Sequence, residues 1–243
     1  DGSSVRKVMY GSEPMPPELA RALHDRFQCP IEQHYGMNET GHISWSALDD
    51  LPEIAATTVG KPVPGARVRI VDEERQPLPE GERGEVAVKT SQMMEGYHRA
   101  PELTARIFDD EGWFYTGDVG YVGDDGNLRL VDRKSDVIIR GGQNVYPAEV
   151  EAYLELHPAI QRAGVIGVAK ELGGQAVWAY VERVPGAELS AGEVRSYCRG
   201  QIAGFKVPSQ VRFVDRMPLS VTDKVQRYKL RELAAKERSE KSQ

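Results

Sequence analysis

Four polar side chains stand at positions where a folded chain could hold a nucleotide: Glu39, Asp118, Arg133 and Lys224. Glu39 follows a strand-like run at residues 31–35, and a carboxylate at the carboxyl end of a strand can hold Mg²⁺ on a nucleotide phosphate. Lys224 lies in a polar loop, where a mobile ammonium can contact a carboxylate and a phosphate together. Taken singly, each of these two residues is better explained as a solvated surface side chain.

Asp118 and Arg133 form a second candidate pair. An aspartate just beyond a strand can accept hydrogen bonds from both hydroxyls of a ribose, but it is as often a turn former. Arg133 follows fifteen residues later and can reach the same sugar, or an α-phosphate, through its planar guanidinium. Its alternative role is a surface salt bridge, so the pair alone leaves ligand binding and structure both open.

The composition of the chain excludes several classes of protein. Hydrophobic residues make up 40% and charged residues 28% of the 243, which predicts a packed core in one or two domains. The net charge of −6 argues against a nucleic-acid partner. No apolar run approaches the roughly 18 residues of a membrane span. Two isolated cysteines fit a reducing, cytoplasmic location, and the five scattered histidines predict no zinc site.

The periodicity of the chain changes twice. Residues 1–56 have an α/β pattern, with strands predicted at 5–10 and 31–35 and a helix that starts at Pro17. Residues 57–133 are short strands separated by turns, which predicts a small antiparallel sheet or barrel. Residues 134–243 are α+β: a hairpin at Gly141-Gly142 is followed by two helices, three strands and a charged terminal helix. Ser190 and Glu193 predict a reciprocal helix cap in this part.

Ten short motifs in a fixed order make a functional role the better explanation of these polar residues. They include Tyr35-Gly36-Met37-Asn38-Glu39, Met94-Glu95-Gly96-Tyr97, Tyr115-Thr116-Gly117-Asp118, Asp132-Arg133, Gly142-Gln143-Asn144-Val145-Tyr146-Pro147 and the Lys224 loop. With this series, residues 8–233 resemble the adenylate-forming superfamily, which contains acyl-CoA synthetases, adenylation domains of peptide synthetases and firefly-type luciferases.

The resemblance implies a fold and a reaction. Residues 1–133 would be the C-terminal part of a large N-terminal domain, an α/β segment (1–56) followed by a β-barrel-like subdomain (57–133). Residues 134–243 would be a small mobile α+β domain that carries the catalytic lysine. The implied enzyme is an AMP-forming acid–thiol ligase. It joins a carboxylic acid to AMP with MgATP, releases pyrophosphate, and then passes the acyl group to a thiol.

The resemblance also implies a role for individual residues. Nucleotide binding would fall to Gly11, Ser12, Glu13, Tyr35, Gly36, Asn38, Asp118 and Arg133. Glu39 would hold Mg²⁺, and Lys224 would bridge the substrate carboxylate and the phosphate, with Glu39 and Arg133 beside it in catalysis. Gly142 would line the thiol tunnel, and Ser135 would be the hinge. His34, Met37 and His42 would line the acyl pocket, where a bulky His34 favours a short, branched or aromatic acid.

Several positions depart from the family pattern. Asn38 stands where Thr or Ser is usual, and its amide can still donate to a phosphate oxygen. Asp223 replaces the glycine before the catalytic lysine, and Ser135 replaces Asp or Lys at the hinge. The family's phosphate-gripping loop lies upstream of residue 8 and has no counterpart in this sequence. We therefore expect an incomplete site, and a missing N-terminal portion of a longer enzyme as a partner.

Two questions stay open at the level of sequence. The sequence from Gly141 to Glu151 is similar to the corresponding segment of acyl-CoA synthetases, so coenzyme A is the expected thiol. The alternative is a stand-alone enzyme that loads the phosphopantetheine thiol of a carrier protein. A hypothesis from another class is a binding module that holds AMP-like ligands without turnover, but such a module would not need Lys224.

Overall fold

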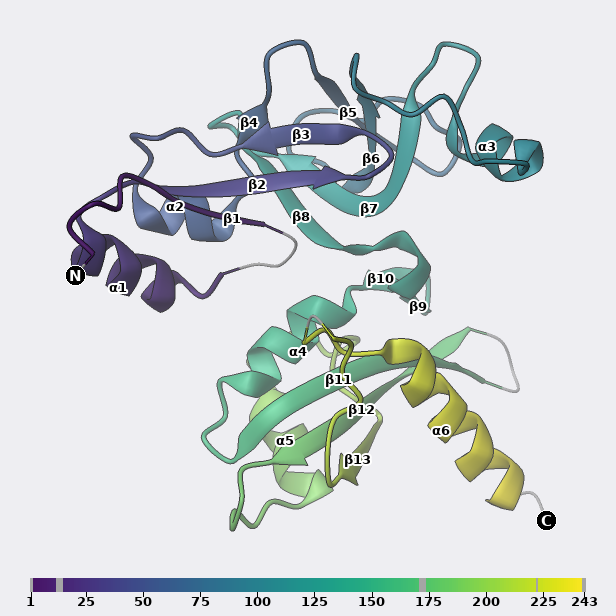
Figure 1. The fold of residues 1–243 in the computed structure, drawn as a ribbon. Helices are drawn as coiled ribbons and strands as arrows, with labels where there is room; N and C mark the ends of the chain where they lie inside the picture. The colour runs from purple at the N-terminus through teal and green to yellow at the C-terminus, as the bar shows by residue number, and fades with distance from the viewer. Residues whose placement is uncertain (1, 12–14, 171–173, 222, 242–243) are drawn as a thin grey trace. The chain divides into compact units, whose positions relative to one another are not determined.

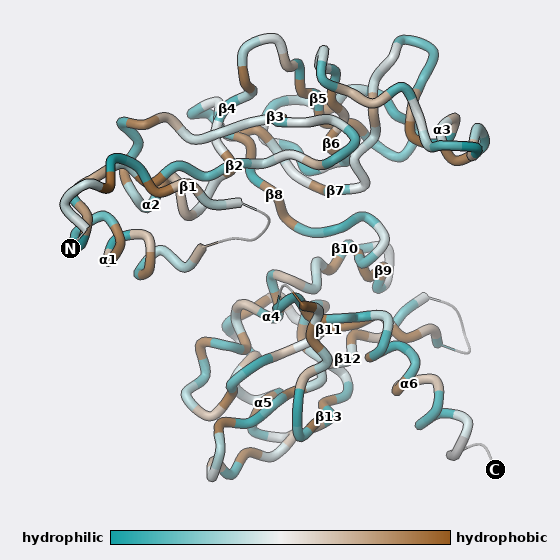
Figure 2. The backbone as a smooth tube through the Cα atoms, viewed as in Figure 1, coloured by the Kyte–Doolittle hydropathy of each residue, from teal (hydrophilic) through white to brown (hydrophobic). Residues whose placement is uncertain are grey.

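The computed structural model describes residues 2–11, 15–170, 174–221 and 223–241 (Figure 1). The chain divides into two compact units, Asp1–Lys134 (unit 1) and Ser135–Gln243 (unit 2). In both units, hydrophobic and hydrophilic stretches are interleaved along the chain (Figure 2), as expected of elements that bury only one face. No helix in the described ranges is long and apolar enough to cross a membrane.

Unit 1 opens with a mixed four-stranded sheet in the order β1-β2-β3-β4. Helix α1 starts at Pro17, as predicted, and connects β1 to the parallel strand β2. A turn of three residues then reverses the chain into β3, which pairs antiparallel with β2. The elements are β1 (Val8–Gly11), α1 (Pro17–Phe27), β2 (Ile31–Met37), β3 (Gly41–Trp45), α2 (Pro52–Thr57) and β4 (Lys61–Pro62).

The second sheet of unit 1 is antiparallel, in the order β5-β6-β7-β8. Its strands are β5 (Arg67–Val71), β6 (Gly84–Lys89), β7 (Phe114–Val122) and β8 (Leu128–Arg133), and α3 (Pro101–Ile107) precedes β7. The predicted barrel is wrong: among the described residues, β5 and β8 are the two edges of the sheet and do not pair with each other. Each strand pairs only with its neighbours in the chain, and four strands are too few to close around a packed interior.

The two sheets of unit 1 share one core. Tyr35 and Ile43 of the first sheet are buried in the same apolar cluster as Val86, Val88 and Phe114 of the second. Because side chains alternate along a strand, the residues of β2 on the Tyr35 side face the second sheet. This packing brings Tyr35 towards the strand that carries Asp118.

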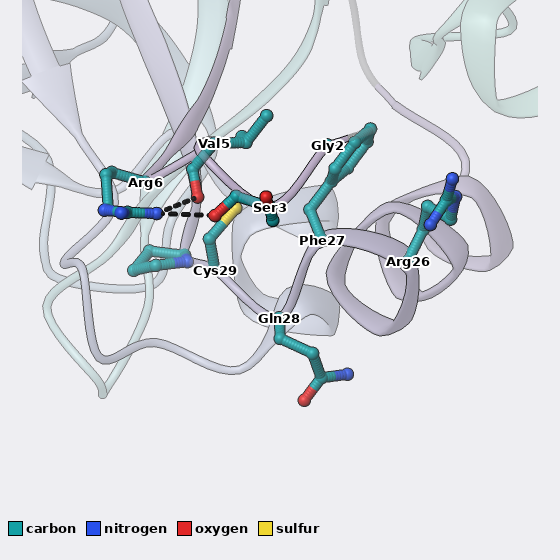
Figure 3. Close-up of a pocket in the computed structure, with 9 residues that line it drawn as sticks. Gly2, Ser3, Val5, Arg6, Arg26, Phe27, Gln28 and Cys29 are labelled. Carbon is teal, nitrogen blue, oxygen red and sulfur yellow. Dashed lines mark hydrogen bonds between the residues drawn. The ribbon is translucent and has the colours of Figure 1, made fainter.

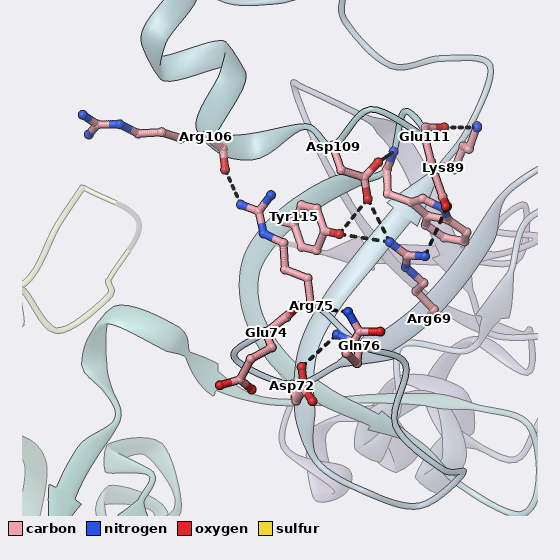
Figure 4. A network of polar contacts seen from close by, with 11 residues as sticks. Arg69, Asp72, Glu74, Arg75, Gln76, Lys89, Arg106, Asp109, Glu111 and Tyr115 are labelled. Carbon is pink, nitrogen blue, oxygen red and sulfur yellow. Dashed lines mark hydrogen bonds and ion pairs between the residues drawn. The ribbon is translucent and has the colours of Figure 1, made fainter.

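A polar network fastens the segment between α3 and β7 onto the second sheet (Figure 4). Arg69 Nη2 on β5 lies 2.9 Å from both Asp109 Oδ2 and the Tyr115 hydroxyl, and Tyr115 donates a 2.7 Å hydrogen bond to Asp109. The Arg69 guanidinium also stacks over the Trp113 ring, 4.2 Å from its centroid. The network contains none of the residues that were predicted to bind a ligand or to take part in catalysis. We therefore assign it a structural role.

Unit 2 contains a three-stranded sheet with helices on both faces and a separate two-stranded sheet of β9 and β10. Strand β12 lies between the antiparallel β11 and the parallel β13. One core cluster contains residues of α4 and α5, and a second contains Leu230 and Ala234 of α6 with Ile166 and Tyr180 of the sheet. The elements are β9 (Ile138–Arg140), β10 (Gln143–Val145), α4 (Pro147–Glu155), β11 (Ile160–Ala169), β12 (Gln175–Arg183), α5 (Ala191–Cys198), β13 (Gln210–Val214) and α6 (Arg227–Lys241).

Candidate active site

Asp118 is the point where three parts of unit 1 meet. It is buried on β7 and lies directly opposite Arg133 of β8. The Tyr35 hydroxyl, from the other sheet, donates a 2.6 Å hydrogen bond to Asp118 Oδ2. Arg133 Nε lies 2.9 Å from Asp118 Oδ1, and its Nη1 donates to the carbonyl of Thr116 at 3.3 Å. Three predicted nucleotide-binding residues are thus brought together on one carboxylate.

The electrostatics of this cluster are set by burial. Burial raises the pKa of Tyr35 well above its usual value, and the Asp118 charge and hydrogen bond raise it further. The phenol therefore stays neutral and keeps donating its proton to Asp118. A carboxylate is an acceptor with about four positions, which makes Asp118 chemically suited to the hydroxyl groups of a sugar.

Glu39 lies in the tight turn between β2 and β3. Thr40 N donates to Met37 O at 3.2 Å to close the turn, and Thr40 is buried while Asn38 is exposed. The half-buried Glu39 accepts a 2.9 Å hydrogen bond on Oε1 from the Tyr97 hydroxyl. No group of three or more His, Cys, Asp and Glu side chains in the described residues is placed to hold a metal ion. Mg²⁺ on a nucleotide needs only one or two carboxylates with phosphates and waters, so a single glutamate fits it.

Two of the three predicted acyl-pocket residues lie together. The rings of His34 and His42 are 5.2 Å apart, with their Nδ1 atoms at 3.4 Å, and His34 Nε2 lies 3.2 Å from Glu32 Oε2. Trp45 flanks both rings. Met37, by contrast, packs against the shared core of the two sheets, apart from the histidines.

The predicted glycines differ in what they do. A side chain at Gly36 would lie 2.3 Å from Gly41 O, so Gly36 is needed for the close approach of β2 and β3. Likewise, a side chain at Gly11 would lie 2.9 Å from His34 O on the neighbouring strand. Gly142 has φ 78° and open space around it in the two-residue turn between β9 and β10, which confirms the predicted hairpin. Ser12 and Glu13 lie outside the described residues.

Lys224 is exposed in a narrow loop of unit 2. The loop is closed by the Leu219–Val225 bridge, by a 2.8 Å bond from Ser220 N to Lys224 O, and by a bond from Lys224 N to Ser220 Oγ. Asp223 has φ 65°, the left-handed conformation in which glycine is at ease, and its carboxylate pairs with Arg162. The arginine offsets the negative charge next to Lys224. Lys224, Gly142 and Ser135 belong to unit 2, and the Asp118 and Glu39 sites belong to unit 1.

Unit 1 also contains a cavity of about 580 Å³ (Figure 3). It is lined by residues 26–30 at the end of α1 and by Gly2, Ser3, Val5 and Arg6. Arg6 Nη1 donates to the carbonyls of Ser3 and Val5 at 2.8 and 3.4 Å. The cavity includes no predicted site residue, so it does not enter the candidate active site.

Comparison with known proteins shows the family to which this sequence belongs. Residues 1–98 match the AMP-binding enzyme family, and residues 149–224 match the AMP-binding enzyme C-terminal domain. The chain belongs to the adenylate-forming AMP-binding enzymes. Glu39 and Tyr97 lie in the first match and Lys224 is the last residue of the second, whereas Asp118 and Arg133 lie between the two.

Individual members of the AMP-binding enzymes are similar over nearly all of this chain. The 2-succinylbenzoate–CoA ligase of Geobacillus kaustophilus (strain HTA426) is 40% identical over 237 residues, 96% of this chain and 47% of that protein. The fatty acid–[acyl-carrier-protein] ligase ScoC of Streptomyces coeruleorubidus is 36% identical, over 96% of this chain and 45% of that protein. The chain spans about half the length of these curated relatives.

A solved structure of an AMP-binding enzyme shows the same fold. The o-succinylbenzoate coenzyme A synthetase MenE of Bacillus subtilis, in complex with ATP and a magnesium ion, superposes with a TM-score of 0.80 at 34% identity. The match covers 93% of this chain and 46% of that one. The mixed α/β and α+β fold class predicted from the sequence is therefore confirmed.

Two contact residues of the site were missed by sequence reasoning. Tyr97 belongs to a quoted motif but received no role, because nothing in the sequence shows that it reaches Glu39 across 58 positions. Buried Glu85 accepts a 3.1 Å bond from Gly117 N, next to Asp118, and also pairs with Lys134 Nζ at 2.6 Å. Glu85 thereby ties the strand of Asp118 to the last residue of unit 1.

Proposed function

We propose that the protein is a carboxylic acid–CoA ligase that acts through an acyl-adenylate. In the first step, a carboxylate oxygen attacks the α-phosphorus of MgATP, and pyrophosphate leaves. In the second, the sulfur of coenzyme A attacks the acyl carbon and AMP leaves. The observation that carries the proposal is the convergence of Tyr35 and Arg133 on buried Asp118, which holds in place a carboxylate of the kind that accepts from sugar hydroxyls.

The residues of unit 1 are proposed to bind the nucleotide. Asp118 would accept from the ribose hydroxyls, while Arg133 is held beside it with an exposed guanidinium that can reach the α-phosphate. Tyr35 would flank the adenine, as would Ser12 and Glu13. Gly11 and Gly36 would shape the backbone around it. Asn38, exposed in the turn, would donate to the α-phosphate.

Glu39 is proposed as the protein's ligand to magnesium. A bound Mg²⁺ neutralises charge on the phosphates and so favours attack by a carboxylate. Glu39 is half-buried in a turn whose backbone is closed by its own hydrogen bond, which keeps the carboxylate in one place. The magnesium complex of the Bacillus subtilis MenE structure supports the use of this ion.

The residues of unit 2 are proposed to serve the two steps in turn. Lys224 would neutralise the substrate carboxylate and the α-phosphate during adenylation. Gly142, with no neighbour around its α-carbon, would leave room for the thiol. We propose that units 1 and 2 correspond to the predicted domains 1–133 and 134–243, and that Ser135 is the hinge; the division after Lys134 supports this assignment.

The thiol and the acid are further proposals. The Geobacillus relative named as a CoA ligase favours coenzyme A, while ScoC, named for an acyl-carrier protein, supports a carrier thiol as the alternative. The His34–His42 pair would form a polar, aromatic wall of the acyl pocket, which suits a short, branched or aromatic acid. A cytoplasmic location remains our proposal and rests on the two buried free cysteines, Cys29 and Cys198.

ATP–pyrophosphate exchange by the purified protein tests the function. With Mg²⁺, a panel of short, branched and aromatic acids, and the N-terminal portion that we expect as a partner, we expect exchange with one class of acid; residues 1–243 alone should give none. Lys224→Ala should abolish it, yet spare thioester formation from ready-made acyl-adenylate. Lys229→Ala removes an exposed lysine five residues away and should change neither step. Equal exchange in Lys224→Ala would contradict the role of the lysine, and AMP binding without any exchange would favour the binding-module alternative.

A further inference from the structure

The segment from Thr90 to Tyr97, here called the strap, is bonded along the turn that carries Glu39. Thr90 Oγ1 donates to Thr40 O at 3.1 Å, and Gln92 Oε1 accepts from His42 N at 3.3 Å. Met94 N donates to the carbonyl of Glu39 at 2.8 Å. The strap is therefore bonded both to the turn and to the start of β3, and its last contact is the Tyr97 hydroxyl on Glu39 Oε1 at 2.9 Å.

The backbone of Tyr97 is fixed from the other side by Thr104 of α3. Tyr97 N donates to Thr104 Oγ1 at 2.9 Å, and Thr104 Oγ1 in turn donates to Ala100 O at 3.1 Å. Gly96 has φ 154°, and a side chain there would lie 2.8 Å from Thr104 Cγ2. Because the Tyr97 side chain is 39% exposed, its direction is set by these backbone contacts and not by packing in the core.

The Tyr97 hydroxyl affects only one of the two oxygens of Glu39. The phenol donates to Oε1 at 2.9 Å. A carboxylate with one oxygen engaged by a donor is held in orientation, and its other oxygen is directed to one side. Partners of this kind orient ligands and tune their affinity for metal ions.

From this geometry we infer that Tyr97 is a positioning residue that orients the Glu39 carboxylate, through Oε1, for the magnesium of MgATP. The inference rests on the proposed role of Glu39 as a metal ligand. The strap sets the distance between turn and phenol, and Thr104 sets the direction of the phenol. Glu39 Oε2 is then presented to the metal without a search among carboxylate orientations.

Metal binding measured apart from turnover tests the inference. Free Mn²⁺ is followed by electron paramagnetic resonance during titration of the purified protein with Mn²⁺ in the presence of a non-hydrolysable ATP analogue. Tyr97→Phe should raise the dissociation constant for Mn²⁺ about tenfold, the lower end of the effect of losing an outer partner of a metal ligand. The Mg²⁺ concentration for half-maximal pyrophosphate exchange should rise by a similar factor. Affinity for AMP without metal and the thermal midpoint should not change.

Matched variants separate positioning from structure. Tyr228→Phe makes the same chemical change on the exposed Tyr228 of α6 and should leave Mn²⁺ binding unaltered. Thr104→Val keeps the phenol but removes its backbone anchor, and should weaken Mn²⁺ binding less than Tyr97→Phe does. If Tyr97→Phe binds Mn²⁺ as well as Tyr228→Phe does, the inference is wrong.

Glu39→Gln separates a failure of the proposed role of Glu39 from a failure of the inference about Tyr97. If this variant binds Mn²⁺ normally, the proposed metal-binding role of Glu39 fails, and the inference about Tyr97 fails with it. If Glu39→Gln loses Mn²⁺ while Tyr97→Phe does not, only the positioning role of Tyr97 is overturned. Loss in both variants, with the thermal midpoint retained, supports the inference.

Discussion

At the scale of single residues, the bond between Tyr35 and Asp118 is a direct polar link between the two sheets of unit 1. It joins a buried phenol to a buried carboxylate across 83 positions of sequence. A hydrogen bond to a charged group contributes about 1.5–3 kcal/mol to stability. We therefore expect Tyr35→Phe to lower the free energy of unfolding by this amount in urea denaturation at pH 7. Tyr121→Phe, on a half-buried tyrosine of β7, should have little effect.

The same bond has a defined pH dependence. Because burial and Asp118 raise the pKa of Tyr35 in the folded state, its contribution is fully present below the pKa of an unfolded tyrosine, about 10. It is lost as the pH rises above that value, since only the unfolded chain then releases the proton. The stability difference between wild type and Tyr35→Phe should be constant from pH 6 to about 9 and narrow above about 10. A difference that stayed constant up to pH 11 would contradict the assignment.

At the scale of elements, the sequence predicts those features of helices and strands that depend on residues close together in the chain. The start of α1 at Pro17 agrees with the structure, and so does the reciprocal cap of Ser190 and Glu193 on α5. The pattern of residues 84–89 predicts a strand, and β6 has these limits. The pattern also predicts a helix over residues 190–202, but α5 ends at Cys198, because Arg199 has an extended conformation with ψ 130°. The apolar spacing predicts that Leu19 lies on the inward face of α1, which is wrong, since Leu19 is 48% exposed.

Contacts between distant elements could be predicted only where a hairpin fixes the register. The hairpin turn at Asp125-Gly126 brings the strands of Asp118 and Arg133 together, and a register shift between Val119 and Gly120 then places the two residues opposite each other. Strand β3 was missed because the turn before it was interpreted only as a ligand loop. The Tyr97–Glu39 contact and the open second sheet depend on tertiary packing, for which the sequence carries no local signal.

An arginine on α6 gives a prediction at the same scale. Arg227 Nε and Nη2 bind both oxygens of Glu151 on α4, at 3.0 and 2.5 Å, and Nη1 lies 3.1 Å from Asp136 Oδ2. Breaking a buried ion pair costs about 3–5 kcal/mol, and the partial exposure here reduces this to about 2–3 kcal/mol. Arg227→Met should destabilise unit 2 by that amount in urea denaturation.

Arg231 is the matched control on the same helix. It pairs with Asp136 at 2.5 Å, but its side chain is 40% exposed, so Arg231→Met should cost no more than about 1 kcal/mol. Equal losses in the two variants would show that bidentate geometry and burial do not matter at this site. Because Arg227 follows Lys224 by three residues, its loss should also weaken adenylation more than Arg231→Met does.

At the scale of the whole molecule, each unit has apolar clusters of its own. In unit 1, a single cluster joins the two sheets, and in unit 2 one cluster lies on each face of the sheet. Unit 2 also contains its own polar anchors, since Arg227, Glu151 and Asp136 all belong to it. A domain with its own core can in principle fold alone. We therefore expect residues 135–243, expressed separately, to unfold in one cooperative transition.

Two leucines that are close in sequence but differ in burial test this independence. Leu154 on α4 is fully buried in unit 2, and Leu156 just after the helix is 72% exposed. In residues 135–243, Leu154→Ala should lower the free energy of unfolding by about 2–5 kcal/mol, because it removes buried methyl groups and leaves a cavity. Leu156→Ala should change it by less than about 0.5 kcal/mol. If unit 2 is autonomous, urea denaturation of the whole chain should give the same two differences. A non-cooperative transition in the separate fragment, or a Leu154→Ala loss seen only in the whole chain, would show that unit 2 depends on the rest of the protein for its stability.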